Sequence, residues 1–177
     1  MGELAAKALQ TENIEALFDQ IMNDYGQDIL QLTYSYVRNT AVAEDLTQEI
    51  FVKCYKALPD FEQRASVRTW LWRIAINHCK DHLRSWHVRN VMLTYEKEAE
   101  PASSTDIVEH EIIRDNEDQE LKKAVLELPL KFREPIYLHY FEELSLKEIE
   151  KVTGVKVNTI KTRMRRALAL LKERLGG

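Results

Sequence analysis

Cationic side chains and a hydroxyl are grouped near the C-terminus, on one side of a predicted helix pair. Ser145 and Glu148 match a capping box at a helix start, and Gly154 suits the tight turn after that helix. A second helix follows directly, and its apolar positions predict the buried side: Ile160, Met164, Leu168 and Leu171. The residues that this pattern directs away from the core are Lys161, Thr162, Arg165 and Arg166.

Two helices joined by such a turn are typical of a helix-turn-helix. In that motif the second helix enters the major groove, where Arg and Lys bind guanine edges and Thr contacts a polar edge or a thymine methyl. The alternative is a solvated basic helix that closes an ordinary helical hairpin. Because the capping box, the turn glycine and the cationic face fall in register, the sequence favours DNA binding.

A second cationic stripe lies in the middle of the chain. Arg73, Asn77, Lys80 and Arg84 recur at steps of four, three and four residues, so they share one helical face. Residues 61–90 hold six Lys or Arg against two Asp or Glu, with three tryptophans interleaved: Trp70, Trp72 and Trp86. Single-stranded nucleic acid is commonly bound this way, with phosphates on cations and bases on rings or amides. The first two tryptophans are equally suited to anchor the core.

Other residue combinations give weaker indications of a functional site. His78 and His82 flank Cys79 at a spacing that can bind metal, but no further ligand completes the site, so no metal or other cofactor is expected. The sequence has no glycine-rich phosphate loop, nucleophile elbow or paired acid motif, which argues against an enzyme. A helix is expected from Thr40 to Leu58. By themselves, its polar residues indicate only a solvated surface: Asp45, Gln48, Glu49 and Lys56.

The composition describes a soluble chain that favours helices. The 177 residues are 45% hydrophobic, 31% charged and 8% aromatic, and only 5 are glycine. No apolar run is long enough to span a membrane and the first residues do not match a signal peptide, so a cytoplasmic protein is expected. Cys54 and Cys79 could form at most one bridge, which excludes a disulfide scaffold.

The net charge of −4 conceals an uneven distribution. Residues 96–120 hold ten acidic and two basic residues, whereas residues 121–177 have a net charge of +6. Periodicity weakens in the acidic segment and a Pro-Ala-Ser-Ser-Thr run begins at Pro101, which predicts a flexible linker over residues 96–120.

Helical periodicity continues on both sides of this linker, and no strand-like alternation occurs, which predicts an all-α protein of two small helical domains. In the first, residues 1–95, the expected elements are a helix or helix pair from Asn13, a helix capped by Thr40 with Cys54 in its core, and a helix capped by Ser66. The second domain, residues 121–177, contains the helix-turn-helix. There Pro135 is expected to occupy the first turn of its helix or to kink it.

Three sequence blocks occur in a fixed order: AEDLTQEIF at Ala43–Phe51, TWLWRIAIN at Thr69–Asn77, and a third that runs from Leu128-Pro129 through Arg133 to the helix-turn-helix ending NTIKTRMRRA at Ala167. In this order they resemble the extracytoplasmic-function group of the sigma-70 family of RNA polymerase sigma factors. The resemblance covers nearly the whole chain. It implies that residues 1–95 are sigma region 2 and residues 121–177 are sigma region 4.

For region 2, the resemblance implies docking on the clamp of core RNA polymerase through Asp45, Gln48 and Glu49. It further implies that the loop from Phe61 and the third helix capture the −10 promoter element as a single strand. Asn77 matches the position that lines the pocket for a flipped base, and Lys80 and Arg84 would hold phosphates. The full set of implied −10 contacts is Arg64, Arg68, Arg73, Asn77, Lys80 and Arg84.

For region 4, the resemblance implies that the −35 element is bound as duplex DNA through Lys161, Thr162, Arg165 and Arg166, with Arg163 on a phosphate. The acidic linker would thread cationic channels of the polymerase, and region 4 would meet the flap. Control by an anti-sigma factor in a stress or envelope response is implied, with no cofactor and no direct membrane insertion. The alternative is a free-standing helix-turn-helix regulator, which would normally dimerise on a palindromic site.

Overall fold

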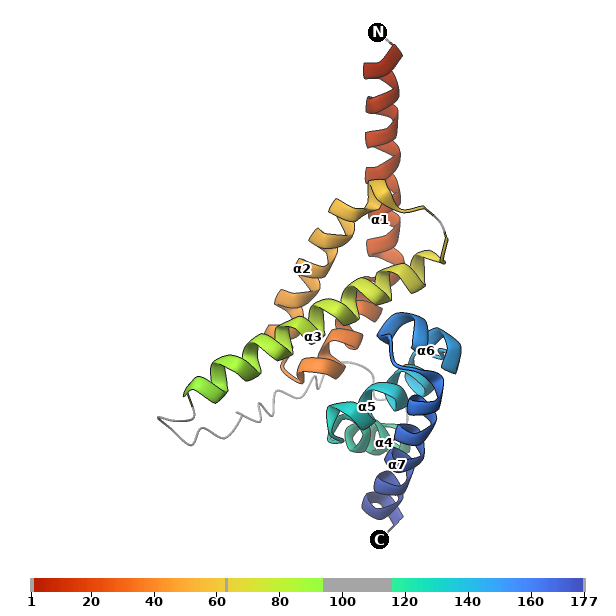
Figure 1. Cartoon of the computed structure of the whole chain (residues 1–177). Coiled ribbons are helices and arrows are strands. Elements are labelled where there is room, and N and C mark those ends of the chain that lie inside the picture. Colours follow the sequence, from red (N-terminus) through yellow and green to blue (C-terminus); the bar gives the residue numbers. More distant parts are fainter. Residues whose placement is uncertain (1, 63, 94–115, 177) are drawn as a thin grey trace.

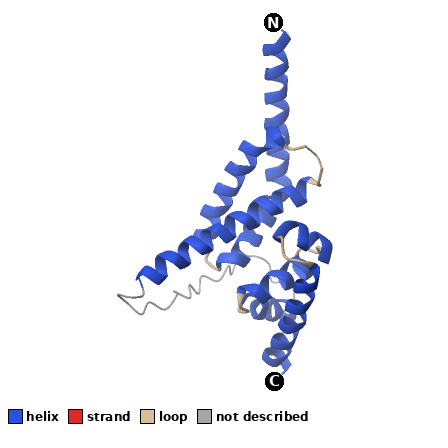
Figure 2. Ribbon diagram, in the orientation of Figure 1, coloured by secondary structure: helices blue, strands red, loops and turns tan. Residues whose placement is uncertain are grey.

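A computed structural model describes residues 2–62, 64–93 and 116–176, with the side chains of 11–62, 64–90 and 119–176. Helices account for nearly all of these residues (Figures 1 and 2). They are α1 (Gly2–Val37), α2 (Thr40–Ala57), the 3₁₀ turn η1 (Leu58–Asp60), α3 (Val67–Leu93), α4 (Asn116–Leu126), α5 (Leu130–Ile136), the π-helical turn η2 (Tyr137–Phe141), α6 (Leu146–Thr153) and α7 (Val157–Gly176). The predicted all-α class with two helical domains is confirmed.

The first lobe is a bundle of α1, α2 and α3. Each helix contributes large side chains that are fully or almost fully buried, among them Ile29, Leu32, Ile50, Leu71, Trp72 and Ile76. Cys54 is also fully buried, as its position on the apolar stripe predicted. Burial raises the pKa of the Cys54 thiol to about 11, so this thiol is a core group and not a nucleophile.

The caps of α2 and α3 test two predicted helix starts. Thr40 was expected to cap α2, and this is wrong: the cap is Asn39, whose extended backbone lets its Oδ1 accept the Val42 N–H at 3.0 Å. Ser66 does cap α3, because its Oγ accepts the Thr69 N–H at 3.1 Å. Pro59 lies inside the 3₁₀ turn that follows α2.

The second lobe contains the predicted helix-turn-helix as α6 and α7. The Ser145 Oγ accepts the Glu148 N–H at 3.2 Å, and Gly154 ends α6 with φ +76°, in the left-handed region. On α7, Ile160, Met164 and Leu171 are buried as predicted, but Leu168 is 45% exposed. Ala167, the preceding residue, is buried in its place. The inward-facing position of that turn is therefore residue 167 and not residue 168.

Pro135 does not lie in a first helical turn. It occupies the last turn of α5, and the π-helical turn η2 begins two residues later. A proline lacks the N–H for an intrahelical bond, which accounts for a change of helical geometry close to this position.

The two lobes pack directly against each other. α6 lies beside α3, and α5 contacts the end of α1 (Figure 1). The buried apolar residues of both lobes form one continuous cluster, from Ile21 of α1 to Leu171 of α7. The predicted linker lies mostly outside the described residues, and α4 begins at Asn116, within its expected range. Among the described helices, none is long and apolar enough to cross a membrane.

We predict opposite effects from alanine at two glycines. A Cβ at Gly154 or at Gly26 of α1 would meet nothing within 4 Å, so only the backbone distinguishes the sites. Gly154→Ala should lower the free energy of unfolding by about 1–2 kcal/mol, because the residue has φ +76°. Gly26→Ala, inside a helix, should raise it by about 0.5–1 kcal/mol. Urea denaturation measures both, and equal signs would contradict the assigned turn.

Candidate nucleic-acid interface

The predicted stripe on α3 forms one face of that helix, but its members have different surroundings. Asn77 is exposed, as are Arg73 and Arg84, whereas Lys80 is half-buried. Arg68, one turn before Arg73, is also half-buried. The half-buried cations, and one of the exposed ones, contact the second lobe.

Arg68 reaches the turn between η2 and α6. Its Nη2 donates to the Glu142 carbonyl at 2.6 Å and lies 3.3 Å from the Glu142 carboxylate. Its guanidinium also stacks over the Trp72 ring, 4.9 Å from the centroid. The Glu142 residue is buried, so Arg68 is held by an anion, a carbonyl and a ring together.

Arg73 binds the C-terminal end of α6. Its Nε and Nη2 donate to the Lys151 carbonyl at 3.0 Å and 2.9 Å. A carbonyl in the last turn of a helix has no intrahelical partner and lies at the negative end of the helix dipole. Arg73 therefore caps the first helix of the helix-turn-helix.

Lys80 meets a buried carboxylate from α5. Its ammonium lies 3.0 Å from the Glu134 Oε2, and the Tyr36 hydroxyl of α1 donates to the same oxygen at 2.5 Å. The Glu134 residue is 6% exposed. The pKa of the Tyr36 hydroxyl is raised well above its usual value, first by burial and then by the Glu134 charge, so the phenol remains a hydrogen-bond donor.

Arg133, next to Glu134, also joins the second lobe to the first. One of its terminal nitrogens donates to the carbonyls of Leu126 and Leu128, and the other donates to the Tyr36 carbonyl at 3.1 Å. Burial lowers the pKa of the Arg133 guanidinium to about 10, which still leaves it charged at neutral pH.

The remaining predicted −10 residues face solvent. Arg64 pairs with Glu62 at 3.0 Å and Arg84 with Asp81 at 3.6 Å, and all of these side chains are highly exposed. Such surface pairs contribute little and can exchange for a phosphate. Asn77 is exposed between them on the α3 face.

The three tryptophans have three different environments. Trp72 is fully buried and anchors the core, in edge-to-face contact with Tyr25 at 5.5 Å. Trp70 is half-buried, 4.8 Å from the Phe61 ring at the start of the loop before α3. Trp86 is 45% exposed. Only Trp86, and part of the Phe61–Trp70 pair, can offer a ring face to a base.

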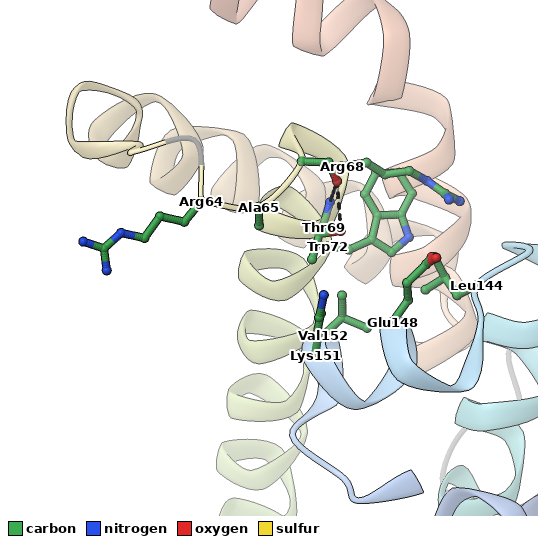
Figure 3. A pocket seen from close by; sticks show the side chains of 10 residues that line it. Arg64, Ala65, Arg68, Thr69, Trp72, Leu144, Glu148, Lys151 and Val152 are labelled. Carbon is green, nitrogen blue, oxygen red and sulfur yellow. Dashed lines mark hydrogen bonds between the residues drawn. The ribbon is translucent and has the colours of Figure 1, made fainter.

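A cleft of about 400 Å³ separates the start of α3 from the second lobe. Figure 3 shows Thr69 and Trp72 on one wall and Leu144, Glu148, Lys151 and Val152 on the other. Arg64 extends away from both walls, into solvent. The segment predicted to bind the −10 strand thus faces the helix-turn-helix across a narrow opening.

The predicted docking residues of α2, Asp45, Gln48 and Glu49, are all exposed. Glu49 also bonds across to α3: its carboxylate lies 2.6 Å from the His78 Nε2. Within the described residues, no group of three or more His, Cys, Asp or Glu could hold a metal ion. Of the two histidines considered as metal ligands, His78 instead contacts the Glu49 carboxylate of the neighbouring helix.

The α7 residues predicted to contact duplex DNA form an accessible surface. Lys161, Thr162, Arg165 and Arg166 are exposed, and Arg163 is half-buried. The Thr162 hydroxyl donates to the Asn158 carbonyl at 3.0 Å, which fixes its side chain along the helix. α7 thus presents its cations to solvent while α6 contacts α3.

Sequence reasoning missed the acceptors Glu134 and Glu142. Each borders an apolar stretch on one side, Glu134 before Pro135-Ile136 and Glu142 after Tyr140-Phe141, and both are buried. A carboxylate beside such a stretch is a signal for a buried ion pair, since an isolated buried charge is very costly. The sequence does not reveal that their partners come from the other lobe.

Comparison with known families identifies the class of protein. Residues 21–93 match the model of sigma-70 region 2, and residues 118–171 match that of sigma-70 region 4. The chain belongs to the sigma-70 family.

Individual relatives define the group within the family. The chain is 31% identical to the RNA polymerase sigma factor SigV of Bacillus subtilis, over 93% of this chain and 94% of SigV. It is 32% identical to the ECF RNA polymerase sigma factor SigW of the same organism, over 89% of this chain and 88% of SigW. The resemblance to extracytoplasmic-function (ECF) sigma factors is confirmed, which favours a sigma factor over a free-standing regulator.

Two solved structures have a similar fold. The chain is similar to the sigma factor RpoE of Bartonella quintana, solved in complex with the anti-sigma factor NepR, with a TM-score of 0.70 and 25% identity over 90% of this chain and 96% of that one. CnrH, solved in complex with the cytosolic domain of CnrY, shares the fold with a TM-score of 0.63 and 24% identity over 92% and 89% of the two chains.

We predict that Glu142 makes the folded state less stable as the pH rises. Burial raises the pKa of its carboxyl from 4.5 to about 7, against the opposing effect of Arg68. The folded chain therefore binds more protons than the unfolded chain between these values, so the free energy of unfolding falls as the pH rises from about 4.5 to about 7. Urea denaturation across this range should show a smaller fall for Glu142→Gln.

The matched control for this measurement is Glu143→Gln, which removes a carboxyl from the exposed neighbouring residue. Its pH dependence should follow that of the wild type. If Glu142→Gln also followed the wild type, the burial of that carboxyl in the folded state would be contradicted.

Proposed function

We propose that this chain binds core RNA polymerase in the cytoplasm and directs it to promoters that carry a −10 and a −35 element. The observation that carries this proposal is the presence of two cation-bearing helix faces, one on α3 and one on α7, within a chain of the sigma-70 family. The function uses binding energy and requires no catalytic residue of this chain.

In this proposal, the α3 face binds the −10 element as a single strand. Asn77 holds a flipped base, because its amide can donate to and accept from the edge of a base. Arg64, Arg68, Arg73, Lys80 and Arg84 contact the phosphates, which position the strand without reading its sequence. The exposed ring of Trp86 is available for stacking near the end of the helix.

The α7 helix binds the −35 element in the major groove. Lys161, Thr162, Arg165 and Arg166 contact base edges, and Arg163 contacts a phosphate. The exposure of the four base-contacting residues on one helix that follows a capped turn supports this assignment.

The α2 residues Asp45, Gln48 and Glu49 dock on the polymerase clamp, and the second lobe meets the flap. An exposed acidic and amide surface suits a basic partner surface. The similarity to RpoE, solved with the anti-sigma factor NepR, supports the proposal that an anti-sigma factor also holds this chain inactive, in a stress or envelope response.

Transcription with purified core polymerase tests the proposal. Genomic fragments are transcribed with and without the chain, and transcript 5′ ends are sequenced. We expect start sites that depend on the chain and that share two spaced upstream elements. The absence of such sites, together with failure to co-purify with core polymerase, would refute the proposed function.

Two α7 variants separate base contact from general charge. Arg165→Ala should reduce transcription from a dependent promoter by roughly fivefold to 150-fold, since one arginine–guanine contact contributes about 1–3 kcal/mol. Lys172→Ala removes an exposed cation from the same helix, outside the predicted contacts, and should leave transcription nearly unchanged. Equal effects would show that α7 contributes only general electrostatic attraction.

A further inference from the structure

The solvent side of α7 holds a polar residue that the predicted DNA contacts leave out. The buried side of this helix is formed by Ile160, Met164, Ala167 and Leu171. Asn158 precedes Thr162 by four residues and Arg165 by seven, so the three share one line on the opposite side. All three are exposed. Asn158 therefore lies in line with two residues that the proposed function places on base edges.

The first turn of α7, which carries Asn158, is fixed by two hydrogen bonds. The Val157 N–H donates to the Glu150 Oε2 of α6 at 3.3 Å, and the Ile160 N–H donates to the Lys156 carbonyl at 3.0 Å. Because Asn158 stands between the two donors in the sequence, its backbone is held in the helix. A contact residue on a fixed backbone loses less conformational entropy when it binds.

The Glu150 carboxylate also makes this helix start a poor phosphate site. Free N–H groups at the start of a helix commonly bind phosphate. Here Glu150 accepts the Val157 N–H and places a negative charge at the same point. This charge repels a DNA phosphate, so the first turn is left for contact with bases.

The Asn158 side chain is an uncharged amide with donors and an acceptor. Among the described residues, none bonds this side chain, since the bond to the Thr162 hydroxyl at 3.0 Å uses the Asn158 backbone carbonyl. In the major groove, an asparagine amide pairs with two atoms of adenine, accepting from N6 and donating to N7. Guanine offers two acceptors there, and thymine offers one acceptor and a methyl group, so neither matches the amide.

We propose that Asn158 is a specificity-determining residue of α7, which binds an adenine of the −35 element in the major groove. The inference rests on the proposed function, since it takes α7 as the helix that enters the groove. A recognition helix places its N-terminal residues against base edges, and Asn158 is the second residue of α7.

The helix geometry fixes where this adenine lies relative to the base that Arg165 contacts. The seven residues from Asn158 to Arg165 span about 10 Å along the helix axis. Base pairs follow one another at about 3.4 Å along the duplex, and recognition-helix residues at steps of about three to four contact successive bases. The adenine therefore lies about two to three base pairs from the guanine bound by Arg165.

The test measures base preference with the polymerase complex. Core polymerase with the full chain transcribes a dependent promoter whose −35 element is randomised, and a barcode in each transcript identifies its template. The variants are Asn158→Ala, Asn158→Asp and Arg165→Ala. Asn23→Ala is the control, because it makes the same change at an exposed residue of α1.

The wild type should prefer adenine at one base pair of the −35 element. Asn158→Ala should reduce this preference by roughly fivefold to 150-fold, the discrimination expected of one bidentate contact. Preferences at the other base pairs should stay as in the wild type. Arg165→Ala should lose a guanine preference about two to three base pairs away, and Asn23→Ala should match the wild type throughout.

Asn158→Asp keeps the test independent of damage to the helix start. Aspartate has nearly the same shape, and its negative charge near a helix N-terminus stabilises the helix. A carboxylate only accepts, so the preference at this base pair should change from adenine to cytosine, whose N4 donates. Repulsion between the aspartate and DNA lowers transcription from all templates and leaves the ratio of bases unaffected.

Three outcomes would overturn the inference: a wild-type profile without an adenine preference, an Asn158→Ala profile that is unchanged or weakened equally at every base pair, or an adenine preference retained in Asn158→Asp. Loss at one shared base pair in Asn158→Ala and Arg165→Ala would also overturn it. Dependent transcription persists in each of these cases, so the proposed function would stand. Absence of dependent transcription with the wild type would instead refute the proposed function, and the inference with it.

Discussion

The position of the second lobe depends on one carboxylate that receives donors from two helices of the first. Glu134 accepts from Tyr36 of α1 and from Lys80 of α3, and the adjacent Arg133 donates to the carbonyl of Tyr36. A charge buried at such a site is stable only with its partners, and loss of one partner of a buried pair costs roughly 3–5 kcal/mol. Two successive residues of α5 therefore join the second lobe to both α1 and α3.

The two helices of the helix-turn-helix have different surroundings in this arrangement of the lobes. α6 lies against α3 and receives Arg73 at its C-terminal end, whereas α7 directs its cations to solvent. α6 therefore contributes to the contact between the lobes, whereas α7 presents the cations that the proposed function assigns to the −35 element.

Local patterns predicted much of this structure from the sequence. The helix-turn-helix, its capping serine, its turn glycine and the buried Cys54 follow from short-range spacing, which local sequence determines. Thr40 and Leu168 were misassigned because a one-residue shift of a cap or an apolar stripe leaves the pattern nearly unchanged. The bonds of Arg68, Arg73 and Lys80 to the second lobe could not be predicted, since they join residues far apart in the chain.

The Lys80–Glu134 pair is tested most directly by the acylation rate of Lys80, followed by mass spectrometry in the wild-type chain and in Glu134→Gln. The Lys80 side chain is 22% exposed and paired with Glu134, whereas Lys147 of α6 is exposed. We predict that Lys80 reacts more slowly than Lys147 in the wild-type chain and that Glu134→Gln raises the rate of Lys80. Equal rates of the two lysines in the wild-type chain, or no rise in Glu134→Gln, would contradict the Lys80–Glu134 pairing.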